Sequence, residues 1–173
     1  MKRALTSVIV LLAVAATASA AEWKNVKSEE GDFALRFPGE PKPSKQEVAT
    51  AAGNLTVYML SLEADKGKTA YMVTYNEMPA AKDAEATLDA ARDATVTPLK
   101  AKVVSETKLS LAGNPGREFV CACKVQNRDA TMHNRIYLVG GRMYQLRVVA
   151  VGDSPVRAED IKTFFESFAL LKK

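Results

Sequence analysis

The order of hydrophobic and polar positions predicts strands over much of the chain. Residues 33–37 alternate Phe33, Leu35 and Phe37 with other side chains, which is the two-residue period of a half-buried strand. Between this strand and the next, the three prolines of residues 38–43 predict a loop. Runs rich in Val, Leu, Tyr and Thr predict further strands, with a turn at Gly53-Asn54, over residues 46–50, 55–62 and 69–75.

The pattern becomes helical at residue 83. Residues 83–99 are dense in Ala, Glu, Asp and Arg, and Asp83 can cap a helix whose positive first turn suits Glu85. Leu88, Ala91 and Thr95 fall on one narrow stripe of that helix. We therefore expect the helix to cover a sheet while contributing little buried hydrophobic area.

A second group of strands follows this helix. The predicted strands cover residues 102–111, 117–125, 130–139 and 142–151. Gly140-Gly141 is typical of a two-residue hairpin turn, and such a turn would place Tyr137 opposite Tyr144.

A helix is predicted to close the chain, with Ser154 as its N-cap and Pro155 at its first position. We expect it to anchor the core through a stripe formed by Val156, Ile161, Phe164, Phe165 and Phe168. Strands, a helix, a four-stranded meander and a closing helix together predict an α+β fold. This fold is a sandwich of an antiparallel β-sheet with flanking helices, in a single domain over residues 21–173.

The first twenty residues have the pattern of a secretory signal peptide. Lys2 and Arg3 precede an apolar run over residues 8–16, and Ala18-Ser19-Ala20 then predicts cleavage before Ala21. The alternative, a membrane anchor, would need about 20 apolar residues, and this run is shorter. The sequence therefore predicts an extracytoplasmic protein, periplasmic or secreted, and no further apolar run predicts a membrane span after Ala21.

Net charge gives little support to a polyanionic partner. The 24 basic and 20 acidic residues give a formal charge of +4, but two of the basic residues lie in the predicted signal peptide. An exported chain so close to neutrality is not expected to bind nucleic acid. The basic residues of the second strand group are expected to form a solvated face or cross-strand salt bridges; they are Arg117, Lys124, Arg135, Arg142 and Arg147.

No recognisable catalytic motif occurs in the sequence. The single histidine, His133, excludes a zinc site of several histidines, and a Ser–His–acid triad would depend wholly on it. Gly-x-Ser-x-Gly and the glycine-rich phosphate-binding motifs are missing, and nothing singles out a catalytic pair among the many carboxylates. We therefore expect a protein that is not an enzyme and has no cofactor.

Cys121 and Cys123 stand two residues apart on a predicted strand, so their side chains share one face. Alternate strand side chains lie about 6.5–7 Å apart, which disfavours an internal disulfide. The two cysteines are either small buried hydrophobic residues or a soft-metal site with Met132 or His133. A two-residue turn at 127–128 would pair Cys123 with Met132, and a three-residue turn at 127–129 would pair it with His133.

Several local signatures resemble the Mog1/PsbP-like fold family over about residues 23–170. They are Phe33 with Phe37-Pro38-Gly39 and Pro41, Gly113-Asn114-Pro115-Gly116-Arg117-Glu118-Phe119, Arg135-Ile136-Tyr137-Leu138, Tyr144-Gln145-Leu146 and Phe164-Phe165-Glu166-Ser167-Phe168. The resemblance implies an α/β/α sandwich and a protein-binding role. Plant members dock on photosystem II, a nuclear-transport member binds a small GTPase, and many exported bacterial members have no assigned activity.

These observations predict an exported, non-enzymatic binding or accessory module whose partner is another protein. One alternative is a soft-metal protein of the copper type that uses Cys121 and Cys123. Another is a small-ligand-binding or hydrolytic domain with a cleft between sheet and helix. Copper(I) titration would test the former, and a pocket with converging polar groups would favour the latter.

Overall fold

The computed structural model describes residues 22–50, 53–79, 83–154 and 156–172. The predicted signal peptide, residues 1–20, and the cleavage point before Ala21 lie outside the described residues. In chain order the elements are β1 (Lys24–Ser28), β2 (Phe33–Phe37), β3 (Lys42–Thr50), β4 (Gly53–Ala64), the 3₁₀ turn η1 (Asp65–Gly67), β5 (Thr69–Glu77), α1 (Ala84–Val96), β6 (Lys102–Leu111), β7 (Asn114–Val125), β8 (Arg128–Val139), β9 (Arg142–Val151), α2 (Ala158–Glu166) and β10 (Ala169–Leu170).

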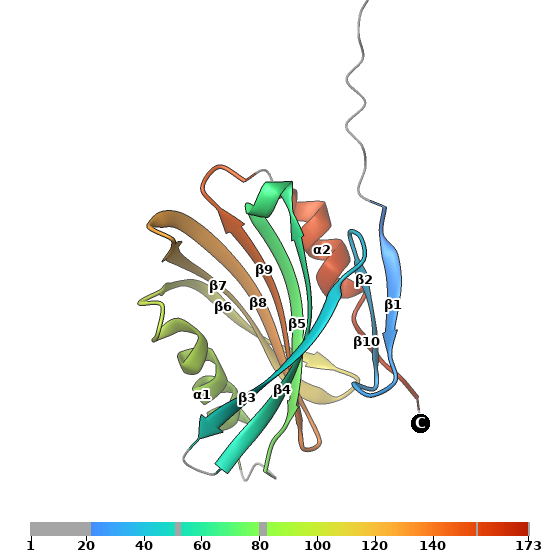
Figure 1. Ribbon diagram of the computed structural model, residues 1–173. Coiled ribbons are helices and arrows are strands. Elements are labelled where there is room, and N and C mark those ends of the chain that lie inside the picture. Colours follow the sequence, from blue (N-terminus) through green and yellow to red (C-terminus); the bar gives the residue numbers. More distant parts are fainter. Residues whose placement is uncertain (1–21, 51–52, 80–82, 155, 173) are drawn as a thin grey trace, which may run out of the picture.

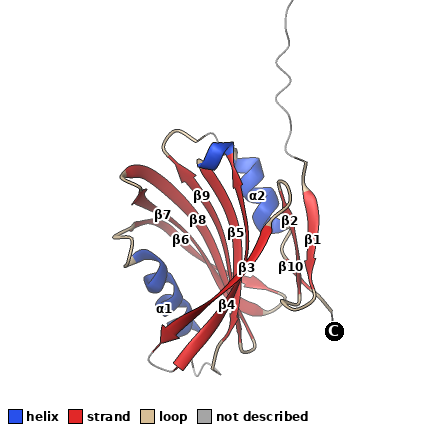
Figure 2. Ribbon diagram, viewed as in Figure 1, coloured by secondary structure: helices blue, strands red, loops and turns tan. Residues whose placement is uncertain are grey.

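The strands form two antiparallel sheets (Figures 1 and 2). The large sheet has the order β3-β4-β5-β9-β8-β7-β6, and the small one has the order β1-β2-β10. The large sheet is curved, with α1 on one side and α2 and the small sheet on the other (Figure 1). The predicted α+β class, an antiparallel sheet flanked by helices, is confirmed. Neither described helix is long and apolar enough to cross a membrane.

Aromatic side chains fill the core between the large sheet and α2. Phe37 contacts Phe164 edge to face at 5.2 Å between ring centroids, and Tyr137 stacks on Phe168 at 5.8 Å. The predicted Gly140-Gly141 turn is present, and Tyr137 pairs with Tyr144 as expected. These contacts anchor α2 and the small sheet to one face of the large sheet, as the sequence predicted for the closing helix.

A second core lies under α1, on the opposite face of the large sheet. Leu88 of α1 is fully buried there against Phe119, Ile136 and Met143 of the strands. The predicted cap is present, because the Ala86 amide donates a hydrogen bond of 3.1 Å to Asp83 Oδ1. The narrow apolar stripe of α1 thus supplies one large buried side chain, in agreement with the expectation of a small contact area.

Two boundaries near the start of the large sheet differ from the prediction. Strand β3 begins at Lys42, inside the predicted loop of residues 38–43, and includes Pro43. Proline is tolerated there because β3 is an edge strand, where one side of the backbone has no partner strand. The predicted turn at Gly53-Asn54 is wrong, because both residues pair with β3; residues 51–52, which join the strands, lie outside the described part.

The register of β7 against β8 also differs from both predicted alternatives. Val125 pairs with Arg128, so the turn consists of Gln126 and Asn127, with φ values of 49° and 63°. Positive φ at both central residues gives the turn twist that suits a tight hairpin. Both turns that the sequence predicted lie later in the chain, and Gln126 gives no turn signal because glutamine rarely adopts this conformation.

The closing helix begins later than predicted. Its first residue is Ala158 and its N-cap is Arg157, so Ser154 does not cap it. The Ser154 hydroxyl instead lies 2.6 Å from the Thr69 hydroxyl and ties this segment to β5. Pro155 lies outside the described residues.

Candidate binding site

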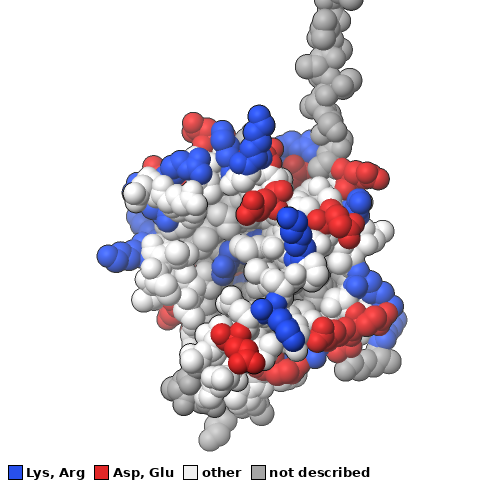
Figure 3. Space-filling model, in the orientation of Figure 1, with Lys and Arg blue, Asp and Glu red and all other residues white. Residues whose placement is uncertain are grey.

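Strand β9 displays a row of side chains on the α1 side of the large sheet. Met143, Gln145, Arg147, Val149 and Val151 occupy alternate positions and therefore point to the same face. Helix α1 packs mainly over the neighbouring strands β7 and β8. The sheet face on the β5 side of α1 is consequently hollowed (Figure 3).

Two hollows follow one another along this row, and together they form what we call the trough. The first, the helix cleft, has a volume of about 560 Å³ and includes Met143 and Gln145 in its lining. The second, the arginine hollow, has a volume of about 310 Å³ and includes Arg147, Val149 and Val151. The trough therefore extends along the length of β9.

The walls of the helix cleft are mainly small or apolar. Helix α1 contributes four alanines, and the sheet side contributes Leu55, Met78 and Met143. Asn76 and Gln145 add hydrogen-bonding groups on neighbouring strands. Four of the six methionines in the chain line the trough; they are Met72, Met78, Met132 and Met143. Methionine side chains are flexible and polarizable, so such a lining adapts to ligands of different shape.

Arg147 lies between the trough floor and the last turn of α1. Its Nε donates a hydrogen bond of 2.8 Å to Asn134 Oδ1, and its Nη2 donates one of 3.3 Å to Thr95 Oγ1. Asn134 is itself 1% exposed and fixed by a hydrogen bond of 3.2 Å from its Nδ2 to the Met132 carbonyl. Two neutral groups therefore orient the guanidinium.

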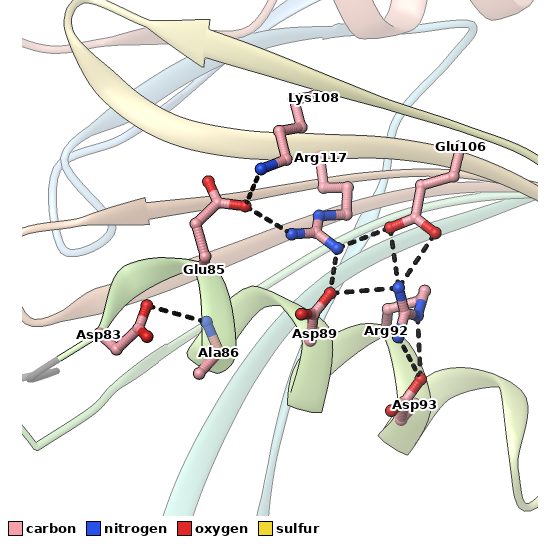
Figure 4. Close-up of polar contacts among 9 residues, drawn as sticks. All are labelled: Asp83, Glu85, Ala86, Asp89, Arg92, Asp93, Glu106, Lys108 and Arg117. Atoms are coloured by element: carbon pink, nitrogen blue, oxygen red, sulfur yellow. Dashed lines mark hydrogen bonds and ion pairs between the residues drawn. The ribbon is translucent and has the colours of Figure 1, made fainter.

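An ionic cluster fixes α1 against the sheet (Figure 4). Arg117 of β7, 5% exposed, pairs with Glu85 at 2.8 Å, with Glu106 at 2.7 Å and with Asp89. Arg92 of α1 extends the cluster to Glu106 at 3.0 Å. A hydrogen bond from Lys108 lowers the pKa of Glu85, and Arg117 adds to that effect. The cluster thus positions the helix that forms one wall of the trough.

The basic residues of the second strand group divide into three kinds. Three form the expected cross-strand pairs: Lys124 with Asp129, Arg135 with Glu118, and Arg142 with Glu77. Arg117 departs from the prediction because it pairs with α1 and β6 from a buried position. Arg147 differs from all of them, because it has no carboxylate within ion-pair distance among the residues that the structure describes.

The residues weighed as soft-metal ligands are only partly brought together. Cys121 and Cys123 are both free and buried, and Met132 lies directly opposite Cys121 on the same face. His133 pairs with Val120 and faces the other side of the sheet. Burial raises the pKa of both thiols, and the described residues contain no group of three His, Cys, Asp or Glu placed to hold a metal.

The sequence predicted α1, β2 and the strands of the large sheet, and it offered a cleft between sheet and helix as one alternative. It predicted neither the small-sheet strands β1 and β10 nor the residues that line the trough. The trough depends on where α1 settles across the sheet, and this position is set by the ionic cluster. Sequence reasoning treated Arg117 and Arg147 as members of one basic group. One feature of the sequence distinguishes Arg147 from the other basic residues. It shares an alternating row of β9 with the apolar Val149 and Val151, which indicates a partly buried face.

The large sheet is curved and antiparallel, with α1 on one face and the closing helix α2 beside the small sheet on the other. This arrangement defines the class of this protein, an α+β module with the PsbP-like fold. The chain is similar to the solution structure of cyanobacterial PsbP (CyanoP) from Synechocystis sp. PCC 6803, with a TM-score of 0.57 and 11% identity, over 92% of this chain and 98% of that chain. It is also similar to a crystal structure from Bacteroides thetaiotaomicron, with a TM-score of 0.52 and 12% identity over 87% of this chain; this match spans 49% of that protein.

These likenesses confirm the predicted PsbP-like fold and, at such low identity, show the fold alone. No family model matches the sequence, and no curated protein matches it. Functional inference for this chain must therefore start from its own site.

Proposed function

We propose that the protein is an exported, non-catalytic binding module that holds an apolar ligand in the trough. The observation that carries this proposal is the trough itself, which has alanine and methionine walls and a few polar groups on its floor. Ligand sites in proteins are commonly concave, mainly apolar and about 300–1,000 Å³ in volume, with few polar groups to orient the ligand. Both hollows fall in this range.

The size of the hollows favours a small ligand over the docking of a protein surface. A straight aliphatic chain would lie along the β9 row, and each buried methylene would contribute about 0.8 kcal/mol. The protein partner that the sequence predicts stays a prediction, and such a partner could receive or deliver this ligand.

The placement of reactive side chains supports binding rather than catalysis. His133 faces the opposite side of the sheet from the trough, so it is not available as a general base there. Cys121 is fully buried under α1, with a raised thiol pKa, which disfavours the nucleophilic thiolate. We place the module outside the cytoplasm on the signal-peptide pattern of residues 1–20.

A neutral fluorescent probe, N-phenylnaphthylamine, tests the proposal. We expect its fluorescence to rise on binding, and we expect Ala90→Trp to abolish the rise because Ala90 lines the cleft and is exposed on α1. The matched control is Ala158→Trp, the same substitution at an exposed position of α2 on the other side of the sheet. Equal probe binding by the parent and Ala90→Trp would overturn the proposal, as would a parent protein that does not bind the probe.

A further inference from the structure

Arg147 has hydrogen-bonding capacity that the protein leaves unused. A guanidinium carries five N–H groups, and two of those on Arg147 donate hydrogen bonds, to Asn134 and Thr95. The other three make no hydrogen bond to the described part of the chain, and the side chain lines the arginine hollow. These donors suffice for a bidentate contact with a planar anion.

The charge of Arg147 also lacks compensation. A partly buried cation normally has a carboxylate partner, since desolvation of a charge is costly. The nearby thiols of Cys121 and Cys123 do not replace one, because burial raises their pKa values above the ordinary 9.0 and leaves them protonated near neutral pH. The arginine hollow is also lined by Lys68 and Arg128 against the single acid Glu63. Lys and Arg side chains, with Asp and Glu among them, lie around the upper part of this face (Figure 3).

We infer that the ligand of the trough is an aliphatic carboxylate, with its chain in the helix cleft and its carboxylate on Arg147. This inference rests on the proposed function and names the ligand class. Gln145 lines the helix cleft, and Arg147, two residues further along β9 on the same face, lines the arginine hollow. Alternate residues of a strand are about 6.5–7 Å apart, so the charge lies close to the Gln145 end of the helix cleft. Asn134 and Thr95 hold the guanidinium in place before the ligand arrives, which limits the entropy lost on binding.

Calorimetric titrations with decanoate and with decanol separate the contribution of the carboxylate charge to binding from that of the alkyl chain. We expect the parent protein to bind decanoate at least about tenfold more tightly than decanol, since charge-assisted hydrogen bonds are among the strong ones. Arg147→Met should remove that preference by weakening decanoate binding, whereas Arg147→Lys should retain most of it. Thermal unfolding confirms that each variant is folded.

The matched control is Lys162→Met, which removes an exposed cation of α2 on the other side of the sheet. We expect it to change decanoate affinity by no more than about twofold, because exposed charges are screened by solvent. Equal losses in Lys162→Met and Arg147→Met would overturn the inference, and so would a parent protein without preference for decanoate. These failures are distinguishable from failure of the proposed function, which is decided by the neutral probe and Ala90→Trp.

Discussion

Replacement of Arg117 by methionine tests whether the ionic cluster holds α1 on the sheet. The Arg117 side chain is 6% exposed and pairs with three carboxylates, two on α1 and one on β6. Methionine fills much of the same volume without the charge, so the variant measures the ion pairs rather than a cavity. The Nε of Arg117 is buried and has no hydrogen-bond partner among the described residues, and the substitution also removes that unsatisfied group.

The expected cost follows from the exposure of the partners. Breaking a fully buried ion pair costs about 3–5 kcal/mol, because an uncompensated charge stays in the interior. Here the carboxylate side chains of Glu85, Asp89 and Glu106 are 46%, 46% and 27% exposed, so water solvates them after the substitution. We therefore expect a loss of about 2–3 kcal/mol, and a Tm lowered by about 5–10 °C for a domain of this size.

Calorimetric thermal unfolding measures this loss, with Lys124→Met as the control. Lys124 pairs with Asp129 at 2.8 Å, but both side chains are exposed, so we expect no measurable change in Tm. Arg117→Met should also weaken binding of the neutral probe, because α1 is one wall of the helix cleft. A Tm lowered by less than about 2 °C would show that the ionic cluster does not anchor α1.

Three further predictions concern Glu85, Gly116 and the two cysteines. The pKa of Glu85 in the folded protein lies below its ordinary value of 4.5, so Glu85 should stabilise the fold above pH 4.5 and lose that contribution as the pH falls through the folded-state pKa. In urea unfolding at a series of pH values, Glu85→Gln should lose less stability in acid than the parent does. An unchanged pH profile in this variant would contradict the prediction. Gly116→Ala should destabilise by about 1–3 kcal/mol, since an added Cβ would lie 2.5 Å from the Tyr137 ring; thermal unfolding at the parent's Tm would contradict this. Cys121 and Cys123 should react with a thiol reagent only in denaturant, because both are buried. Rapid labelling of the native protein would contradict this, because it would show that α1 does not cover the two thiols.

The sequence predicted the elements well where local periodicity determines them. Strands β6 and β9 have the predicted bounds, and Asp83 caps α1 as expected. The register between β7 and β8 was not predictable in the same way, because it depends on Gln126 adopting positive φ. A non-glycine residue accepts that conformation only when the surrounding sheet imposes it.

The candidate site was largely beyond reach of the sequence. The two-residue period places Arg147 on one face of a strand but does not show which side chains from other elements lie on that face. Those neighbouring side chains decide whether the charge of the arginine is paired. Arg117 and Arg147 have the same chemistry, yet one meets three carboxylates and the other meets Asn134 and Thr95. This difference arises from the way α1 crosses the sheet, which is a tertiary property.

A titration of the protein with decanoate, followed through its backbone amide NMR spectrum, shows directly whether the trough binds the ligand. We expect the largest shift changes on α1, β5 and β9, around Ala90, Asn76 and Gln145, and extending to Arg147. Changes centred on α2 and the small sheet β1-β2-β10, with the amides of α1 and β9 unmoved, would contradict the claim that the trough is the binding site.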